Sequence, residues 1–349
     1  MIILDVSVLD YHVTIDCTDY KSANSLKLML SQNNYNFSFL NKPLEHSINI
    51  KYSLNHPPYN LINGQEILLH KDCGNEGEYL LKGYIYKQYK KTIIHNPLLN
   101  NFKEKYENKY ILYGKEQQCF LCIVDLLREQ IFQKYYEYHK YTFLKCAAFA
   151  YNENNLCVII GSHKSGKTTF LLNVLNEHQN FLYVTNSASY INCLNNNIIL
   201  YSWRPHLRIR NGTCKSIHTL TSYYDNKLPL ESDILKIKTY HEFNEFFSNS
   251  ISENGIIKKI IFVQPSDSTS IQQLNDACLI NNKLMKNIKL TDESHPNYLN
   301  LKQRNKSILN KNLNKTLLNM HENIDFYQLN YNVQAKCDYS NILHEVGIL

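Results

Sequence analysis

The sequence predicts a mixed α/β chain (α+β) whose main domain is a largely antiparallel sheet with flanking helices and a glycine-rich loop. The stretch 161–168 reads GSHKSGKT and lies between an apolar run and a run with helical spacing. Strand-like segments occur in pairs before this stretch and close together after it. A wholly parallel sheet would alternate strands with helices, so this order favours mixed, mostly antiparallel pairing.

The front of the chain predicts a small sheet-rich domain. Short extended pieces alternate there with turn signals, at 2–6, 35–39, 48–52 and 79–86. Asn63-Gly64 lies between two apolar runs and is typical of a two-residue hairpin turn, because both residues tolerate a positive φ. We expect this domain to cover residues 1–115 and the main domain to cover 116–349.

A helix is expected where the two domains join. Between about 117 and 139 the apolar residues recur at helical spacing, with charges on the other side. This segment contains Cys119 and Cys122, the C-x-x-C pair of the chain. No second ligand pair follows at metal spacing, so we interpret both as core cysteines rather than as a zinc or redox site.

The remaining elements are expected around the glycine-rich loop. Residues 141–151 and 156–160 predict two paired strands, and 169–175 predicts a helix directly after the loop. Further strands are expected at 181–185, 189–193, 198–203 and 259–263.

Composition limits the possible partners. With 37 basic and 31 acidic residues the formal charge is only +6, which does not indicate nucleic acid. The basic stretches 86–91 and 302–306 would suit a nucleic acid or, equally well, an acidic peptide, but solvated strand or helix faces look the same, and we interpret both stretches as such faces. The start of the chain lacks a secretory signal pattern, and no apolar run reaches the roughly 18 residues that span a bilayer. We therefore expect a cytoplasmic protein without a membrane partner.

The segment 161–168 matches G-x-x-x-x-G-K-[ST] in full, the pattern of a phosphate-binding loop. In such a loop the backbone N–H groups and the positive end of the following helix face a phosphate. Lys167 is the expected catalytic cation at the β/γ-phosphates, and Thr168 is the expected Mg²⁺ ligand. The expected nucleotide-binding residues are Gly161, Ser162, His163, Lys164, Ser165, Gly166, Lys167, Thr168 and Thr169.

Two arginines are further candidates for binding an anion. Arg208 and Arg210 alternate on a predicted strand and therefore lie on one face of it, where they suit a phosphate or an acidic substrate. A solvated strand face explains them equally well. Trp203, the single tryptophan, is interpreted as a core or interface anchor.

The stretch from about Tyr141 to Thr213 resembles the catalytic domain of the HPr kinase-related proteins, whose P-loop sits on a fold like that of phosphoenolpyruvate carboxykinase. The resemblance rests on the order of the strand 143–148, the loop 161–169, the strand 181–187 and the segment 203–213, which looks like the family's I-R-x-G-T segment. The strand 260–263 followed by Pro265 looks like the family's late strand. The resemblance implies ATP and Mg²⁺ as cofactors and a Ser or Thr of a peptide or small protein as acceptor, in some members during peptide maturation.

The chain departs from that family at two ionisable positions. The family's strand after the loop helix ends in an aspartate that helps hold Mg²⁺ and accepts the hydroxyl proton, whereas this chain reads Asn186-Ser187. A histidine of many members falls on Lys145 or Cys146. An asparagine can neither take the proton nor neutralise the metal. The available substitutes are Asp225, Glu231, Asp233 and Asp267, among which the sequence does not choose.

These residues leave three functions open. The leading hypothesis is a Mg-ATP-dependent serine/threonine-type kinase that phosphorylates a peptide or small protein held by the front domain. The alternative is a catalytically degenerate nucleotide-binding scaffold or switch of the same fold. A simple NTPase coupled to another enzyme is a weaker third option. The acceptor, the nucleotide base and the oligomeric state do not follow from the sequence.

Overall fold

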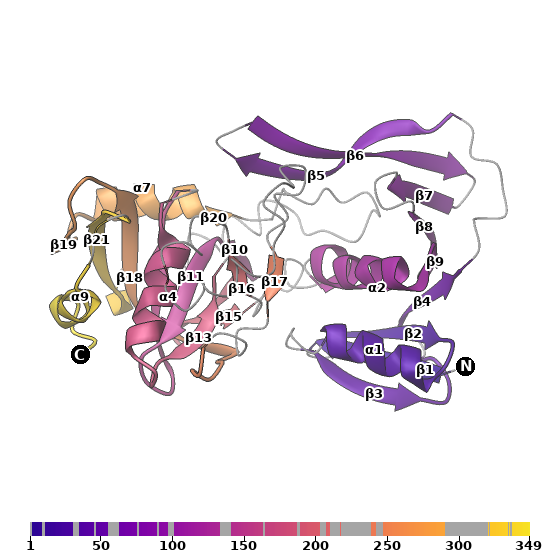
Figure 1. Cartoon of the computed structure of the whole chain (residues 1–349), viewed down its shortest axis with the longest axis horizontal. Helices are drawn as coiled ribbons and strands as arrows, with labels where there is room; N and C mark the ends of the chain where they lie inside the picture. The colour runs from indigo at the N-terminus through magenta and orange to yellow at the C-terminus, as the bar shows by residue number, and fades with distance from the viewer. Residues whose placement is uncertain are drawn as a thin grey trace. The chain divides into compact units, whose positions relative to one another are not determined.

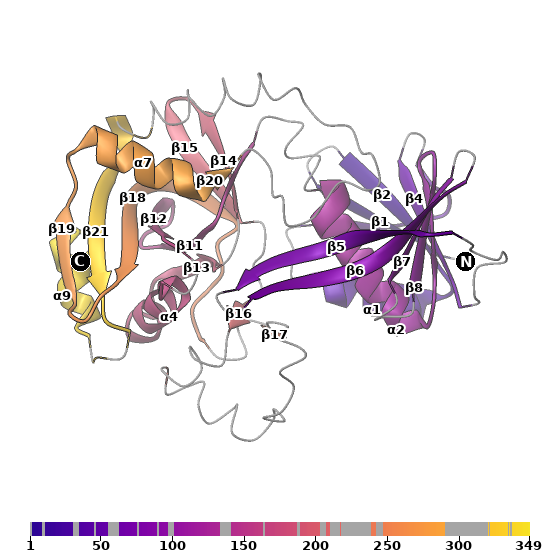
Figure 2. The same cartoon turned by 90° about the horizontal axis from the view of Figure 1, so that it is seen from above.

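The structure is a computed structural model (Figures 1 and 2), and it describes residues 2–8, 11–30, 35–44, 47–54, 63–74, 77–88, 91–96, 101–132, 141–162, 165–186, 189–202, 207–209, 217, 239–241, 247–289, 320, 322–333, 335 and 337–349. The chain divides into two compact units. The first comprises Met1–His139 with Asp292–Arg304, and the second comprises Lys140–Thr291 with Asn305–Leu349. The first unit therefore extends to His139, past the boundary expected near residue 115.

The first unit is built on a nine-stranded sheet in the order β3-β1-β2-β4-β9-β8-β7-β6-β5. Its strands are β1 (Ile2–Val8), β2 (Tyr11–Cys17), β3 (Asn36–Leu40), β4 (Ile48–Ser53), β5 (Gln65–Gly74), β6 (Gly77–Gln88), β7 (Lys91–Asn96), β8 (Asn101–Tyr106) and β9 (Lys109–Tyr113). Strand β4 is parallel to β2 and to β9, and the other neighbours are antiparallel. The expected strand before Asn63 lies outside the described residues, although Asn63 itself has a positive φ of 61°.

Helices cover one face of this sheet. Helix α1 (Tyr20–Leu30) contacts β1 and β2, and α2 (Glu116–Asp125), which continues into the π-helical η1 (Leu126–Phe132), contacts β4 and β9. The covered face carries buried aliphatic and aromatic side chains, among them Leu4, Val6, Val13, Ile15, Ile50 and Leu112. The Ser22 hydroxyl donates to the Glu116 carboxylate at 2.7 Å and links the two helices. Helix α2 therefore packs within the first unit, which places the unit boundary after it.

The expected helix over 117–139 is present as α2 and η1 as far as the structure describes it. Cys119 and Cys122 are both buried in this helix, as expected of core cysteines. Burial raises the pKa of the Cys119 thiol to about 12.

The second unit is built on a ten-stranded mixed sheet. Its strands are β10 (Thr142–Leu144), β11 (Cys146–Ala150), β12 (Asn155–Ile160), β13 (Leu182–Thr185), β14 (Ser189–Leu194), β15 (Asn197–Ser202), β18 (Asn254–Pro265), β19 (Ser270–Gln273), β20 (Ile288–Lys289) and β21 (Asp325–Tyr331). The order is β13-β11-β12-β18-β15-β14-β10-β20, and β21 pairs with β18 and β19. Strand β18 is parallel to β12 and to β21, and the other pairs are antiparallel. The predicted mixed, largely antiparallel sheet is confirmed.

The central strands of this sheet are apolar on both faces because helices cover both. Along β12, Cys157 and Ile159 belong to the core beneath α4 (Lys167–Glu177) and α9 (Tyr339–Glu345). Val158 and Ile160 belong to the core beneath α7 (Ala277–Asn287). Figure 2 shows α4 and α7 on opposite sides of the strands. Each fully buried aliphatic side chain of this kind contributes about 1.5–3 kcal/mol to stability.

A two-residue turn, Asn195-Asn196, joins β14 to β15. Asn195 and Asn196 have φ values of 50° and 62°, which residues in such a hairpin turn must adopt. No helix in the described part of the chain is long and apolar enough to cross a bilayer.

Candidate functional site

The glycine-rich loop lies at the carboxyl end of β12 and leads directly into α4. Gly166 precedes the helix with φ 91° and ψ 6°, a left-handed conformation that favours glycine. A Cβ atom at Gly166 would lie 2.8 Å from Val333 Cγ2 and 2.9 Å from Tyr331 Cδ1. A Cβ at Gly161 would lie 2.4 Å from the carbonyl oxygen of Val263. Close packing therefore requires glycine at both motif positions.

The Lys167 side chain folds back over the loop. Its ammonium donates to the carbonyl oxygens of Gly161 at 2.8 Å and Ser162 at 2.6 Å, and lies 3.4 Å from the Ser165 hydroxyl. Ser165 and Thr169 are buried, whereas Thr168 is half-buried in the first helical turn. The positive charge of Lys167 and the positive, N-terminal end of the α4 dipole therefore lie together at the loop. This arrangement favours the binding of an anion there. His163 and Lys164 lie outside the described residues.

Several strand ends meet at the edge of the sheet that carries the loop. Strands β12, β18 and β21 run in the same direction. Strand β13 also runs this way, because β11 is antiparallel to both β12 and β13. The carboxyl ends of these strands, followed by Asn186 after β13 and by Ser266 after β18, therefore lie on the edge that carries the loop.

Asn186 occupies the position where the resemblance implies an aspartate. It is buried, and the Tyr183 hydroxyl donates to its Oδ1 atom at 3.4 Å. Burial raises the pKa of Tyr183, so this hydroxyl stays protonated. The strand end thus carries a neutral amide beside a neutral phenol, and neither group accepts a proton as a carboxylate does. Ser187 lies outside the described residues.

A buried thiol occupies the start of β11, directly opposite Ile160 on the strand that leads to the loop. Cys146 Sγ lies 3.1 Å from the Ser189 hydroxyl, which donates to the Leu144 carbonyl at 3.3 Å. Burial raises the pKa of Cys146 to about 12, and only a smaller opposing effect comes from Ser189 and the positive charge of Lys167. The thiol is therefore neutral, while Lys145 beside it is exposed. Sequence reasoning missed Ser189, which has no motif around it.

The acidic candidates are only partly placed. Asp267 is exposed in the turn after β18, where its backbone carbonyl accepts a hydrogen bond from Asn332 Nδ2 at 2.8 Å. Asp225, Glu231 and Asp233 lie outside the described residues. Within the described ranges, no group of three or more His, Cys, Asp and Glu side chains is arranged to hold a metal ion.

Of the predicted arginines and the tryptophan, the structure describes only the backbone of Arg208. The backbone of Arg208 lies in the short strand β16 (Leu207–Ile209), which pairs with β17 (Thr239–His241). Trp203 and Arg210 lie outside the described residues, so their expected roles stay predictions.

Comparisons with known proteins give a weak structural likeness. No family model and no curated protein matches the chain. One solved structure, the Hpr(Ser) kinase/phosphatase from Coxiella burnetii, is similar over 52% of this chain and 90% of that chain, with 12% sequence identity and a TM-score of 0.25. Both the identity and the TM-score are low, so this likeness does not indicate what the chain does.

Proposed function

We propose that the second unit binds the phosphates of ATP with Mg²⁺ at residues 161–168, and that the protein is a kinase acting on a hydroxyl group of a peptide or small protein. The observation that carries this proposal is the complete phosphate-loop motif between a buried strand and a helix, with the Lys167 ammonium at the loop. We further propose that the acceptor is a Ser or Thr of a ribosomally made peptide and that it is phosphorylated during the maturation of that peptide. This part of the proposal comes from the resemblance of 141–213 to the HPr kinase-related proteins.

Each loop residue has a defined task in this proposal. The backbone N–H groups of 162–167 surround the phosphates, and Lys167 exchanges its loop carbonyls for β/γ-phosphate oxygens. The Thr168 hydroxyl, in the first turn of α4, is the proposed Mg²⁺ ligand, and the metal would neutralise charge on the transferred phosphoryl group. Phosphoryl transfer depends mainly on positioning and on neutralising charge, so these groups supply most of what the reaction needs.

The second candidate function is a nucleotide-binding scaffold or switch that performs no chemistry. It is favoured by Asn186, a buried amide where the resemblance implies a carboxylate, and by the neutral Cys146 thiol near Lys167. Neither residue accepts the proton that the acceptor hydroxyl must lose. The two candidates share the nucleotide site and differ in turnover.

Incubation of the purified protein with γ-labelled ATP and candidate acceptor peptides tests the kinase proposal. We expect label on the peptide with the wild type and none with Lys167→Ala. If the wild type binds nucleotide but transfers no label, and Asn186→Asp transfers none either, the result would instead support the scaffold function. Gain of transfer in Asn186→Asp would indicate a site that lost its acid at this position. Release of inorganic phosphate without an acceptor would point to a simple NTPase.

A further inference from the structure

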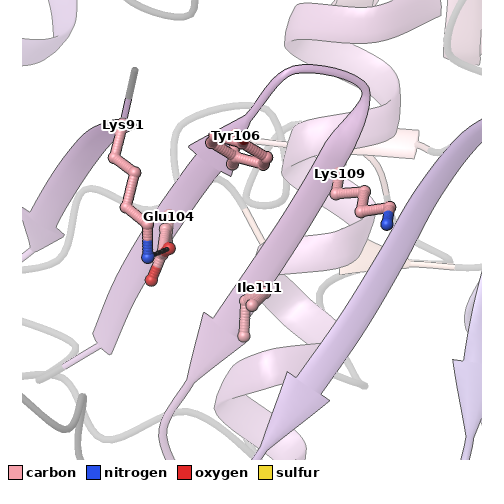
Figure 3. Close-up of a pocket in the computed structure, with 5 residues that line it drawn as sticks. All are labelled: Lys91, Glu104, Tyr106, Lys109 and Ile111. Carbon is pink, nitrogen blue, oxygen red and sulfur yellow. Dashed lines mark ion pairs between the residues drawn. The ribbon is translucent and has the colours of Figure 1, made fainter. Parts of the chain in front are cut away.

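The first unit has two adjoining hollows on the sheet face opposite its helices, which together are called the groove. Two shallow hollows, of about 250 and 280 Å³, share Lys109 and extend across β7, β8, β9 and β4. The first is lined by Lys91, Glu104, Tyr106, Lys109 and Ile111, which Figure 3 shows on one face of the strands. The second is lined by Pro43, Leu44, Ser47, Asn49, Lys51, Asn108 and Lys109.

Buried carboxylates hold the lysines at both ends of this groove. Lys91 Nζ lies 2.7 Å from Glu104 Oε1, and the side chain of Glu104 is only 2% exposed. The Tyr113 hydroxyl donates to the other oxygen of this carboxylate at 3.1 Å. Lys51 Nζ lies 2.8 Å from Asp16 Oδ2, whose side chain is 7% exposed. Each of these two lysines is therefore paired with a buried carboxylate, which fixes its position.

Lys109 lies between these two pairs and differs from both. It is exposed, and no carboxylate among the described residues lies within ion-pair distance of its ammonium. In Figure 3 its amine points away from the pair of Lys91 and Glu104. Among the described residues that line the groove or pair with its lysines, three lysines and two buried carboxylates leave one positive charge, at Lys109.

The surroundings of Lys109 indicate what kind of guest it suits. Tyr106 and Ile111 provide an apolar wall on one side, and Pro43 and Leu44 provide one on the other. Lys91 and Lys109 are two strands apart, which corresponds to about 10 Å at the usual strand spacing. A central cation flanked by apolar surfaces over this span complements an extended segment that carries an acidic side chain between apolar ones.

We propose that this groove binds an acidic, extended segment of the acceptor polypeptide, with one of its carboxylates on Lys109. The proposal rests on the proposed kinase function, to which it adds the substrate class: a polypeptide recognised by an acidic segment away from its phosphorylated hydroxyl. Binding at the groove needs no nucleotide, so the two proposals can fail separately.

The test measures fluorescence anisotropy of a labelled peptide, Ser-Leu-Ser-Glu-Ser-Leu-Ser, with the full chain and without nucleotide, because in an extended chain this spacing places the Glu between the two Leu side chains on one face. A matched peptide with Gln in place of Glu reports apolar binding alone. We expect the Glu peptide to bind at least tenfold more tightly, and Lys109→Glu and Lys109→Gln to remove that difference. Lys21→Glu, the same charge change at an exposed position of α1 on the other side of the sheet, is the control and should bind as the wild type does.

Two results would overturn the groove proposal: equal binding of the two peptides, or full Glu-peptide binding by Lys109→Glu and Lys109→Gln. Circular dichroism of each variant establishes that the sheet is intact. Lys167→Ala should bind the Glu peptide normally. If the wild type binds this peptide but transfers no phosphate to any acidic acceptor, the groove still binds an acidic segment, whereas the kinase proposal fails, and with it the assignment of that segment to an acceptor.

Discussion

Replacing Gly166 by alanine should destabilise the second unit through two separate effects. A left-handed backbone costs an alanine about 1–2 kcal/mol, partly offset by about 0.4–1 kcal/mol from the less flexible unfolded chain. The new Cβ would also lie 2.8 Å from Val333 Cγ2 and 2.9 Å from Tyr331 Cδ1. Overpacking of this kind costs about 1–3 kcal/mol. The expected total is a loss of about 1–4.5 kcal/mol.

Little relaxation is available around this methyl group. The Tyr331 hydroxyl lies 2.7 Å from that of Tyr339, and both residues are buried. The Tyr331 ring also packs edge-on against Phe170 of α4, with ring centroids 5.8 Å apart. Movement of Tyr331 away from the new methyl group would disturb both contacts, so the upper half of the range is expected.

Gly347→Ala is the matched control for this variant. Gly347 also has a positive φ, of 65°, but a Cβ there would meet only Lys259 Nζ at 3.7 Å. Its cost should be limited to backbone strain, about 1 kcal/mol. Hydrogen exchange of the α4 amides against urea reports the free energy of opening in this unit separately from the first. Equal losses in the two variants would refute the packing argument at Gly166.

Two further predictions concern ionisable groups in the second unit. Burial raises the pKa of Tyr339 to about 12 and that of its partner Tyr331 as well, so their contribution to stability is complete below pH 10 and is lost as the pH rises through 12. The double variant Tyr331→Phe/Tyr339→Phe should show a shallower fall in urea-unfolding free energy between pH 10 and 12, and an unchanged slope would contradict the shift. Cys146 is buried with its pKa raised to about 12, whereas Cys278 is exposed. Iodoacetamide at pH 8 followed by peptide mass spectrometry should label Cys278 and leave Cys146 unmodified until urea unfolds the chain; rapid labelling of Cys146 would refute its burial.

The part of the site that is local in sequence is the part that sequence analysis could predict. Strand, loop and helix over 155–177 follow one another in the chain, and their apolar patterns and glycines report the structure directly. The hairpin of β14 and β15 is local for the same reason, because Asn195 and Asn196 determine its turn. These elements explain why the mixed fold was predictable.

The long-range arrangement was not predictable in the same way. β18 lies beside β12 although about a hundred residues separate them, and β21 then pairs with β18. Apolar patterns show that such strands are buried without specifying which neighbours they pair with. The contact between Cys146 and Ser189 depends on this kind of pairing, and so do the ion pairs of Lys51 with Asp16 and of Lys91 with Glu104. The packing of α2 within the first unit likewise depends on contacts with β4 and β9.

Calorimetric titration of MgATP into the wild type and into Lys167→Ala tests the central claim most directly. Loss of the ammonium removes a charged contact to the phosphates worth about 1.5–3 kcal/mol, so binding should weaken by about 10–100-fold or more. Lys259→Ala, at a lysine that pairs with Asp325 on β21, serves as the control and should bind as the wild type does. Equal affinity of Lys167→Ala and the wild type would show that the loop does not hold the phosphates of a nucleotide.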